Sequence, residues 1–226
     1  MSADLQEAVH HRLGIVTVQG YGLTETSPVT HATPNDPSKV KPGSVGSGIR
    51  STETRIVDPS SGNDLEAKQE GEVWIRGPQV MQGYLNRPEA TAETIDADGW
   101  IHTGDIGYVD ETGYLYIVDR LKELIKYKGM QVAPAELEGL LLTHDAIADA
   151  AVIPIANEEA GEVPKAFIVL KPNQRVEAEE IMDFIAEQVA PHKKIRQVEF
   201  VTEIPKSASG KILRRMLVQR ERDKVK

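Results

Sequence analysis

The chain has 226 residues, of which 40% are apolar and 27% charged, a composition typical of globular proteins with a buried core. It carries no cysteine, which excludes disulfide bonds and thiolate metal sites, and its formal net charge of −9 argues against general nucleic-acid binding. No apolar run approaches about eighteen residues and the N-terminus has no signal-peptide pattern, so we expect a cytoplasmic protein without a membrane span.

The first two expected elements are a helix and a strand. Leu5, Val9 and Leu13 recur at helical spacing, which predicts a short amphipathic helix over residues 3–12. Residues 15–18 are short, β-branched and followed by turn residues, which predicts a buried strand.

The segment that follows is the first whose residues could bind a ligand. Gly20 and Gly22 flank Tyr21, and glycines let the backbone approach a flat ligand closely. Thr24 and Glu25 then supply a hydroxyl and a carboxylate, a pairing suited to phosphate and Mg²⁺. A purely structural glycine turn is an equally good interpretation of these residues alone.

Residues 34–118 are expected to form an antiparallel β region, because glycine and proline punctuate short strand-like runs. The strand candidates are residues 54–57, 72–75 and 114–118, and residues 88–94 are expected to form one or two helical turns. The run over 72–76 alternates well enough to predict one solvated face.

Asp105 follows a Thr-Gly turn and precedes an apolar run, so we expect its carboxylate at a strand margin. A carboxylate there can accept two hydroxyl hydrogen bonds from a ribose, each worth roughly 1.5–3 kcal/mol. The alternative is an aspartate that caps its own turn.

The segment Asp119–Glu138 separates two differently patterned regions. Its cations between Arg120 and Lys128 outnumber its single acid, Glu123, which fits either a solvated linker or an anion-binding segment. A helix begins at Pro134, where a proline suits the first helical position.

The remainder predicts a small α+β domain. Strands are expected over residues 148–155, 163–170 and 197–201, and a helix over residues 178–189. A flexible loop over 205–211 then presents Lys211.

A basic helix is expected from about Leu213. From Lys206 onward eight Lys or Arg residues stand against two acids, so the tail is either a solvated helix or a source of positive charge for an anionic ligand.

Together these segments resemble the C-terminal part of the ANL superfamily of adenylate-forming enzymes. The resemblance covers essentially all 226 residues, and DRLKELIKYKGMQVAPAELE at 119–138 is most similar to the 4-coumarate–CoA ligase and luciferase branch. It implies the end of a doubly wound α/β sheet and a β-barrel-like subdomain over 1–118, a hinge over 119–122, and a small α+β lid domain over 123–226.

The resemblance also implies roles for single residues of the large lobe. Tyr21 would stack on adenine, Thr24 would contact the α-phosphate and Glu25 would hold Mg²⁺. Asp105 and Arg120 would bind the ribose hydroxyls. Gly20 and Gly22 would give the adenine room, and Gly22 with Leu23, Pro28 and Val29 would form part of the acyl pocket.

In the small lobe Lys211 would bridge the acyl carboxylate and the phosphate during adenylation. Lys126 and Gln131 would act near the adenylate. A strand containing Lys128 and Gly129 would line the pantetheine tunnel, and Lys122 would be the hinge.

The implied function is that of an AMP-forming acid–CoA ligase that uses ATP, Mg²⁺ and coenzyme A on a 4-coumarate-like aromatic or a fatty acid. The sequence lacks the family's Ser/Thr/Gly-rich phosphate loop ending in Pro-Lys-Gly. We therefore expect a fragment that is inactive alone, with the missing N-terminal part of the same enzyme as its partner. The alternatives are a peptide-synthetase-like or luciferase-like domain, or a non-enzymatic binding module.

Overall fold

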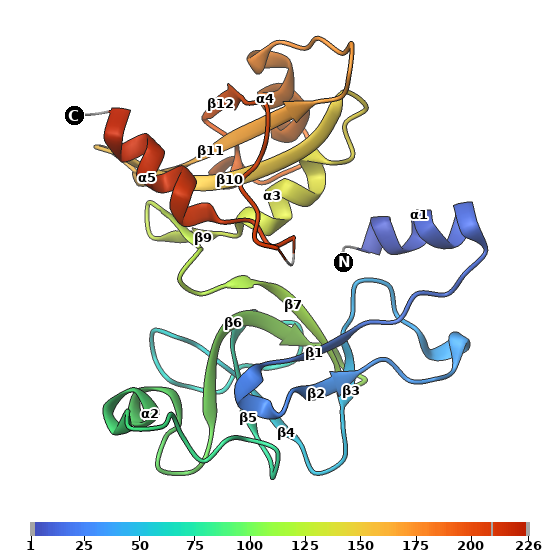
Figure 1. The fold of residues 1–226 in the computed structure, drawn as a ribbon, viewed down its shortest axis with the longest axis vertical. Coiled ribbons are helices and arrows are strands. Elements are labelled where there is room, and N and C mark those ends of the chain that lie inside the picture. The colour runs from blue at the N-terminus through green and yellow to red at the C-terminus, as the bar shows by residue number, and fades with distance from the viewer. Residues whose placement is uncertain (1–2, 209, 225–226) are drawn as a thin grey trace. The chain divides into compact units, whose positions relative to one another are not determined.

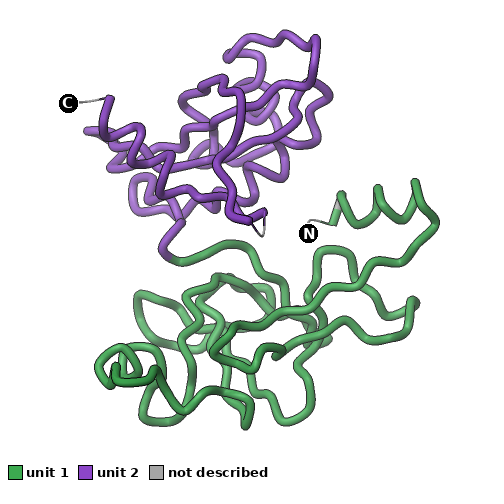
Figure 2. The backbone as a smooth tube through the Cα atoms, viewed as in Figure 1, with its two compact units in different colours: residues 1–121 green, residues 122–226 purple. Residues whose placement is uncertain are grey.

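A computed structural model describes residues 3–208 and 210–224. The chain divides into two compact units, residues 1–121 and residues 122–226 (Figure 2). The division lies between Leu121 and Lys122. Each unit has a sheet and a hydrophobic core of its own, and each is described by itself.

Unit 1 is built on an antiparallel seven-stranded sheet in the order β1-β2-β3-β7-β6-β5-β4 (Figure 1). The strands are β1 Gly20–Gly22, β2 Val29–Ala32, β3 Gly46–Gly48, β4 Glu53–Val57, β5 Gly71–Arg76, β6 Ile101–Val109 and β7 Tyr114–Arg120. The predicted strands over 54–57, 72–75 and 114–118 are confirmed as β4, β5 and β7. Apolar side chains from the central strands, Val73, Ile75, Ile101 and Leu115 among them, form the core.

The helices of unit 1 are short. They are α1 Ala3–Leu13, α2 Pro88–Thr94 and the 3₁₀ helices η1 Thr24–Thr26 and η2 Pro37–Lys39. The predicted helices over 3–12 and 88–94 are confirmed. Gln6, buried at 4% exposure, fastens α1 to the unit, because its amide donates to the Thr17 carbonyl at 2.6 Å and accepts from the Gly43 N–H at 3.0 Å.

The predicted strand over residues 15–18 is wrong. These residues are extended coil between α1 and β1 (Figure 1), and Ile15 and Val18 are 50% and 62% exposed. A strand exists only where its backbone finds a hydrogen-bonded neighbour, and within the described residues the ladder starts at Gly20. Apolar, β-branched composition therefore misled the prediction.

The predicted solvated face of residues 72–76 is confirmed only in part, because Trp74 and Arg76 are half-buried between the buried Val73 and Ile75. Glu72 is only 9% exposed, although it occupies a position that alternation assigns to solvent. Glu72 is therefore the exception on this face, whereas the Arg76 side chain is 39% exposed.

Unit 2 is an α+β unit with a five-stranded sheet in the order β10-β11-β8-β9, and β12 pairs with β11 in parallel. The strands are β8 Ile125–Tyr127, β9 Met130–Val132, β10 Ile147–Asn157, β11 Gly161–Leu170 and β12 Gln197–Phe200. The helices are α3 Pro134–Leu141, α4 Ala178–Ala186, the 3₁₀ helix η3 Pro191–Lys193 and α5 Arg214–Lys224. The predicted strands and helices of this region are confirmed, with ends shifted by at most a few residues.

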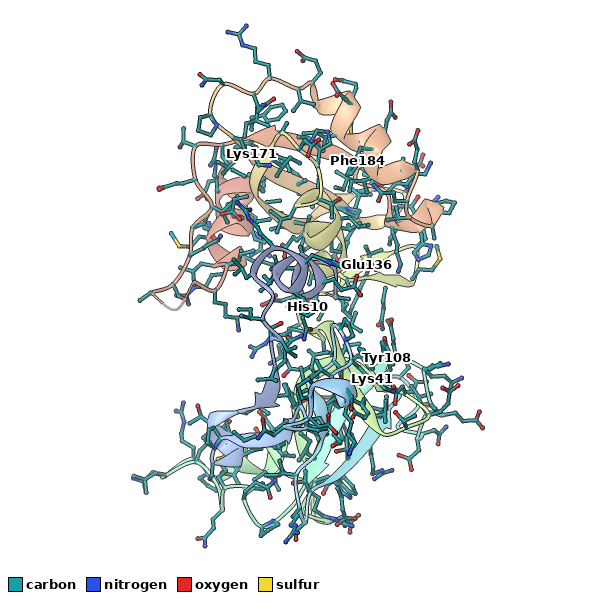
Figure 3. The ribbon with its side chains drawn as sticks, turned by 90° about the vertical axis from the view of Figure 1, so that its right-hand side faces the viewer. His10, Lys41, Tyr108, Glu136, Lys171 and Phe184 are labelled. Carbon is teal, nitrogen blue, oxygen red and sulfur yellow. The ribbon has the colours of Figure 1, made fainter. Side chains whose placement is uncertain are left out.

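Alternating residues of β10 and β11 pack into two hydrophobic cores on opposite faces of the sheet. Val152 and Ile168 pack with α3 and α4, whereas Ile153 and Phe167 pack with Leu217 of α5. The first turn of α3 is anchored by Glu136, labelled in Figure 3, whose carboxylate accepts from Lys193 Nζ at 2.7 Å.

Candidate functional site

Tyr21, Asp105 and Arg120 meet in unit 1 although they are far apart in the sequence. The Tyr21 hydroxyl donates to Asp105 Oδ2 at 2.6 Å, and Arg120 Nε lies 3.2 Å from Asp105 Oδ1. Asp105 and Arg120 face each other directly across the β6–β7 ladder. The sheet therefore assembles three of the residues proposed for the nucleotide.

This cluster has free acceptor capacity. A carboxylate offers about four lone-pair sites, and Asp105 uses one on each oxygen for Tyr21 and Arg120. Burial, followed by the neighbouring Asp105 charge, raises the pKa of Tyr21 far above its ordinary value. Tyr21 thus stays a protonated donor that holds the carboxylate in place.

Asp105 does not lie at a strand margin as predicted. It is inside β6, where the register with β5 shifts between Glu72 and Trp74. Such a bulge redirects side chains within a sheet, a device found next to active sites. Gly104, at φ +69°, supplies the left-handed residue that this geometry requires.

The Thr24–Glu25 pair lies in η1, directly after β1. Thr24 is exposed, and Glu25 Oε1 accepts a hydrogen bond from the Tyr84 hydroxyl at 2.7 Å. No cluster of three or more potential metal ligands exists in the described part of the chain. In phosphate-binding sites Mg²⁺ is usually held by one or two protein carboxylates, and phosphate oxygens and water complete its coordination shell. A single carboxylate, Glu25, fits Mg²⁺ only in a site of that kind.

A glycine is required at position 22 for a structural reason that the sequence did not reveal. A Cβ there would come within 1.7 Å of the Pro28 carbonyl oxygen, so the close approach that Gly22 permits is to its own chain. At Gly20 a Cβ would meet the His31 carbonyl at 3.3 Å, a tight but lesser contact.

The residues proposed for the acyl pocket lie around the same turn. Leu23 is half-buried, whereas Pro28 and Val29 are exposed.

In unit 2 the strands β8 and β9 form a hairpin that pairs Lys126 directly with Gln131. The predicted strand through Lys128 and Gly129 is wrong, because these two residues are the turn, with φ of +48° and +81°. Two positive-φ residues in succession define a type I′ hairpin turn. The turn leaves Lys126, Lys128 and Gln131 exposed.

Lys211 is exposed on a loop whose described residues, 205–208 and 210–213, include an antiparallel bridge between Lys206 and Ile212. Its carbonyl accepts from the Ser207 N–H at 2.8 Å, and Lys206 Nζ pairs with Asp149 at 2.6 Å.

Arg214 fastens the end of this loop. Its guanidinium bridges Glu123 and the 10%-exposed Glu138 side chain of α3. The loop that carries Lys211 is thus tied to the segment following Lys122, itself exposed in a turn.

Several residues that organise the site were not anticipated, namely Glu72, Thr103, Tyr84 and Arg214. Each of them has a partner that is 30 to 91 residues away in sequence, and no local pattern identifies such a contact. The one available signal was a carboxylate, Glu72, directly before the apolar run of residues 73–75.

Comparison with known proteins places this geometry in a family. The profile of the AMP-binding enzyme family matches residues 1–85, and that of the AMP-binding enzyme C-terminal domain matches residues 136–211. A 4-coumarate–CoA ligase from Glycine max is 57% identical over 203 residues, which cover 88% of this chain and 69% of that protein. The chain belongs to the ANL superfamily of adenylate-forming enzymes.

Within the ANL superfamily the chain is 4-coumarate–CoA ligase-like. Tobacco 4-coumarate–CoA ligase 2 is 56% identical over 88% of this chain, but over 37% of its own length. ATP-bound MatB from Rhodopseudomonas palustris superposes with a TM-score of 0.92 at 29% identity, covering all of this chain and 44% of MatB.

The chain thus spans about two fifths of the length of most of the curated relatives it matches. No helix in the described ranges is long and apolar enough to cross a membrane.

Proposed function

We propose that the protein takes part in an AMP-forming acid–CoA ligase reaction on a 4-coumarate-like aromatic acid or a fatty acid. The observation that carries the proposal is the Tyr21–Asp105–Arg120 cluster, in which a buried carboxylate keeps two lone-pair sites for hydroxyl hydrogen bonds. The similarity to 4-coumarate–CoA ligases and to ATP-bound MatB supports the same conclusion.

In the first half-reaction a carboxylate oxygen of the acid attacks the α-phosphorus of ATP. The bond to the leaving pyrophosphate breaks and an acyl-AMP forms. Both reactants are anionic, so the reaction needs cations to offset their repulsion. We assign this role to Lys211, a point charge on an exposed loop, with Thr24 at the α-phosphate.

Glu25 would hold a Mg²⁺ ion at the phosphates, with Tyr84 orienting the carboxylate through its hydroxyl. The ion would supply positive charge against the leaving pyrophosphate.

In the second half-reaction the CoA sulfur attacks the acyl carbonyl, AMP leaves, and the thiol proton passes to solvent. We assign Lys126 and Gln131, paired across the β8–β9 hairpin, to the adenylate, and the Lys128–Gly129 turn to the pantetheine arm. Lys122 would be the pivot that exchanges the two sets of groups.

Binding of AMP to the purified chain, followed by NMR titration, tests the proposal. Asp105→Asn should weaken AMP binding at least about tenfold, because a charged acceptor of two hydroxyl bonds is lost. Asp98→Asn, at an exposed turn aspartate, is the matched control and should bind as the wild type does. Equal AMP affinity in Asp105→Asn and the wild type would refute the proposed site.

We further propose that residues 1–226 do not catalyse adenylation by themselves, because they contain no phosphate loop. Robust ATP–pyrophosphate exchange by the purified chain would contradict this.

A further inference from the structure

Glu72 of β5 is a buried carboxylate that the proposed reaction does not use. Both of its oxygens accept hydrogen bonds from N–H groups. Oε1 accepts from the Gly104 backbone at 2.9 Å and Oε2 from the Trp74 indole at 2.8 Å. Among the described residues no lysine, arginine or histidine forms a salt bridge with it.

The Gly104 bond is the one that reaches the candidate site. On β6, residues 103–105 all lie between the ladder pairs Trp74↔His102 and Glu72↔Ile106, opposite the single residue Val73. Glu72 therefore ties down the centre of a bulge whose last residue is Asp105.

A second side chain closes the same bulge. Thr103 Oγ1 donates to the Val73 carbonyl at 2.7 Å and accepts from the Asp105 N–H at 3.1 Å. The Gly104 carbonyl, in turn, accepts from the Leu121 N–H at 2.8 Å. Gly104 is thus held on both its N–H and its C=O sides.

The chemistry of this position explains why it is a glutamate. Burying a carboxylate without a cation is costly, and an apolar residue would pack in the sheet without that cost. Only a carboxylate, however, offers acceptors at both ends of its head group, whereas a glutamine amide would present a donor to one of the two N–H groups.

We propose that Glu72 is a positioning residue for nucleotide recognition. It holds the bulge so that Asp105 meets Tyr21 and Arg120 with its remaining lone pairs open to the ribose hydroxyls. This inference rests on the proposed function, since it assumes that Asp105 binds the ribose.

The test compares AMP with 2′,3′-dideoxy-AMP, which lacks both hydroxyls, in NMR titrations of the full chain. Glu72→Gln should weaken AMP binding about three- to tenfold and leave dideoxy-AMP binding unchanged, so the preference for AMP falls. A purely structural role would weaken both nucleotides alike. Amide exchange at Gly104 should also accelerate in Glu72→Gln.

Two matched variants complete the experiment. Trp74→Phe removes the indole donor but keeps the Gly104 bond, and should retain the preference. Glu70→Gln, at an exposed position directly before β5, should also retain it. If Glu72→Gln does not fold, Thr103→Val can replace it. This variant removes the Thr103 hydroxyl hydrogen bonds that hold the bulge and should lower the preference for AMP over dideoxy-AMP.

The outcomes separate the two proposals. A wild type that prefers AMP, an Asp105→Asn variant that does not, and a Glu72→Gln or Thr103→Val variant with the full preference would overturn this inference alone. Equal binding of the two nucleotides by the wild type, or binding of neither, would overturn the assignment of Asp105 itself and this inference with it.

Discussion

Among single residues, His31 shows most clearly how a polar group is accommodated in unit 1. It is 2% exposed, and its two ring nitrogens lie 3.0 Å from the hydroxyls of Thr30 and Thr54. Burial lowers the pKa of His31 to about 4. The imidazole is therefore neutral in the folded protein near pH 7 and links β2 to β4 as a hydrogen-bonding group.

A pH dependence of stability follows for unit 1. Below about pH 6.5 the unfolded state binds a proton at His31 that the folded state does not, so the free energy of unfolding falls as pH drops toward 4. The loss attributable to His31 should be on the order of 3 kcal/mol. Urea unfolding at pH 7.5 and 4.5, followed by tryptophan fluorescence, measures it, since both tryptophans, Trp74 and Trp100, lie in unit 1.

Carboxylates also titrate in this range, so the comparison is between variants. His31→Gln should lose less stability than the wild type over this pH interval, while His11→Gln, at an exposed helix position, should lose as much. An identical pH dependence in His31→Gln and the wild type would show that His31 is not the group responsible.

At the scale of elements, the β8–β9 hairpin and α3 show how backbone conformation decides the role of a glycine. A Cβ at Gly129 or at Gly139 would meet no atom within 4 Å, so neither position is sterically crowded. Gly129 has φ +81° in the hairpin turn, whereas Gly139 lies within the helix α3. The two positions therefore differ only in the backbone conformation that the residue must adopt.

The two glycine-to-alanine substitutions should consequently have opposite effects. Gly129→Ala should destabilise unit 2 by about 1–2 kcal/mol, because alanine is strained in the left-handed region. Gly139→Ala should stabilise it by about 0.5–1 kcal/mol, since alanine is the better helix former. Urea unfolding followed by far-UV circular dichroism checks both, and the same sign for the two variants would contradict the explanation.

At the scale of the whole molecule, the chain is two units with separate cores. Unit 2 closes both faces of its sheet with its own helices. In unit 1, by contrast, Leu13, Ile15 and Val18 near the N-terminus are each at least 50% exposed. We therefore expect unit 2 to be the more self-sufficient part.

Residues 122–226 should fold when expressed alone. We expect one cooperative urea transition by circular dichroism and a dispersed NMR spectrum, because the described residues of unit 2 form two hydrophobic clusters of their own. The full chain is the control, with its fluorescence transition reporting unit 1. A gradual transition of the isolated unit, or collapsed NMR signals, would contradict this expectation.

Local patterning was enough to predict those elements that depend on a few neighbouring residues. The strands over 54–57, 72–75 and 114–118 and the helices beginning at Pro88, Pro134 and Ala178 follow from periodicity, proline placement and turn residues, which act over a few positions. The motif around Tyr21 and the segment Asp119–Glu138 also sufficed to indicate the superfamily, which the homologues confirmed.

Local patterning could not predict which distant residues meet or which apolar segments pair with a neighbouring strand. Residues 15–18 have the composition of a strand, but strand formation depends on a neighbouring ladder that sequence patterning does not report. Glu72 is buried where it accepts from the Gly104 N–H, and the bulge that carries Asp105 is held by Glu72 and Val73 of β5 and by Leu121. Such contacts depend on register and strand order, which are properties of the whole sheet and not of any one segment.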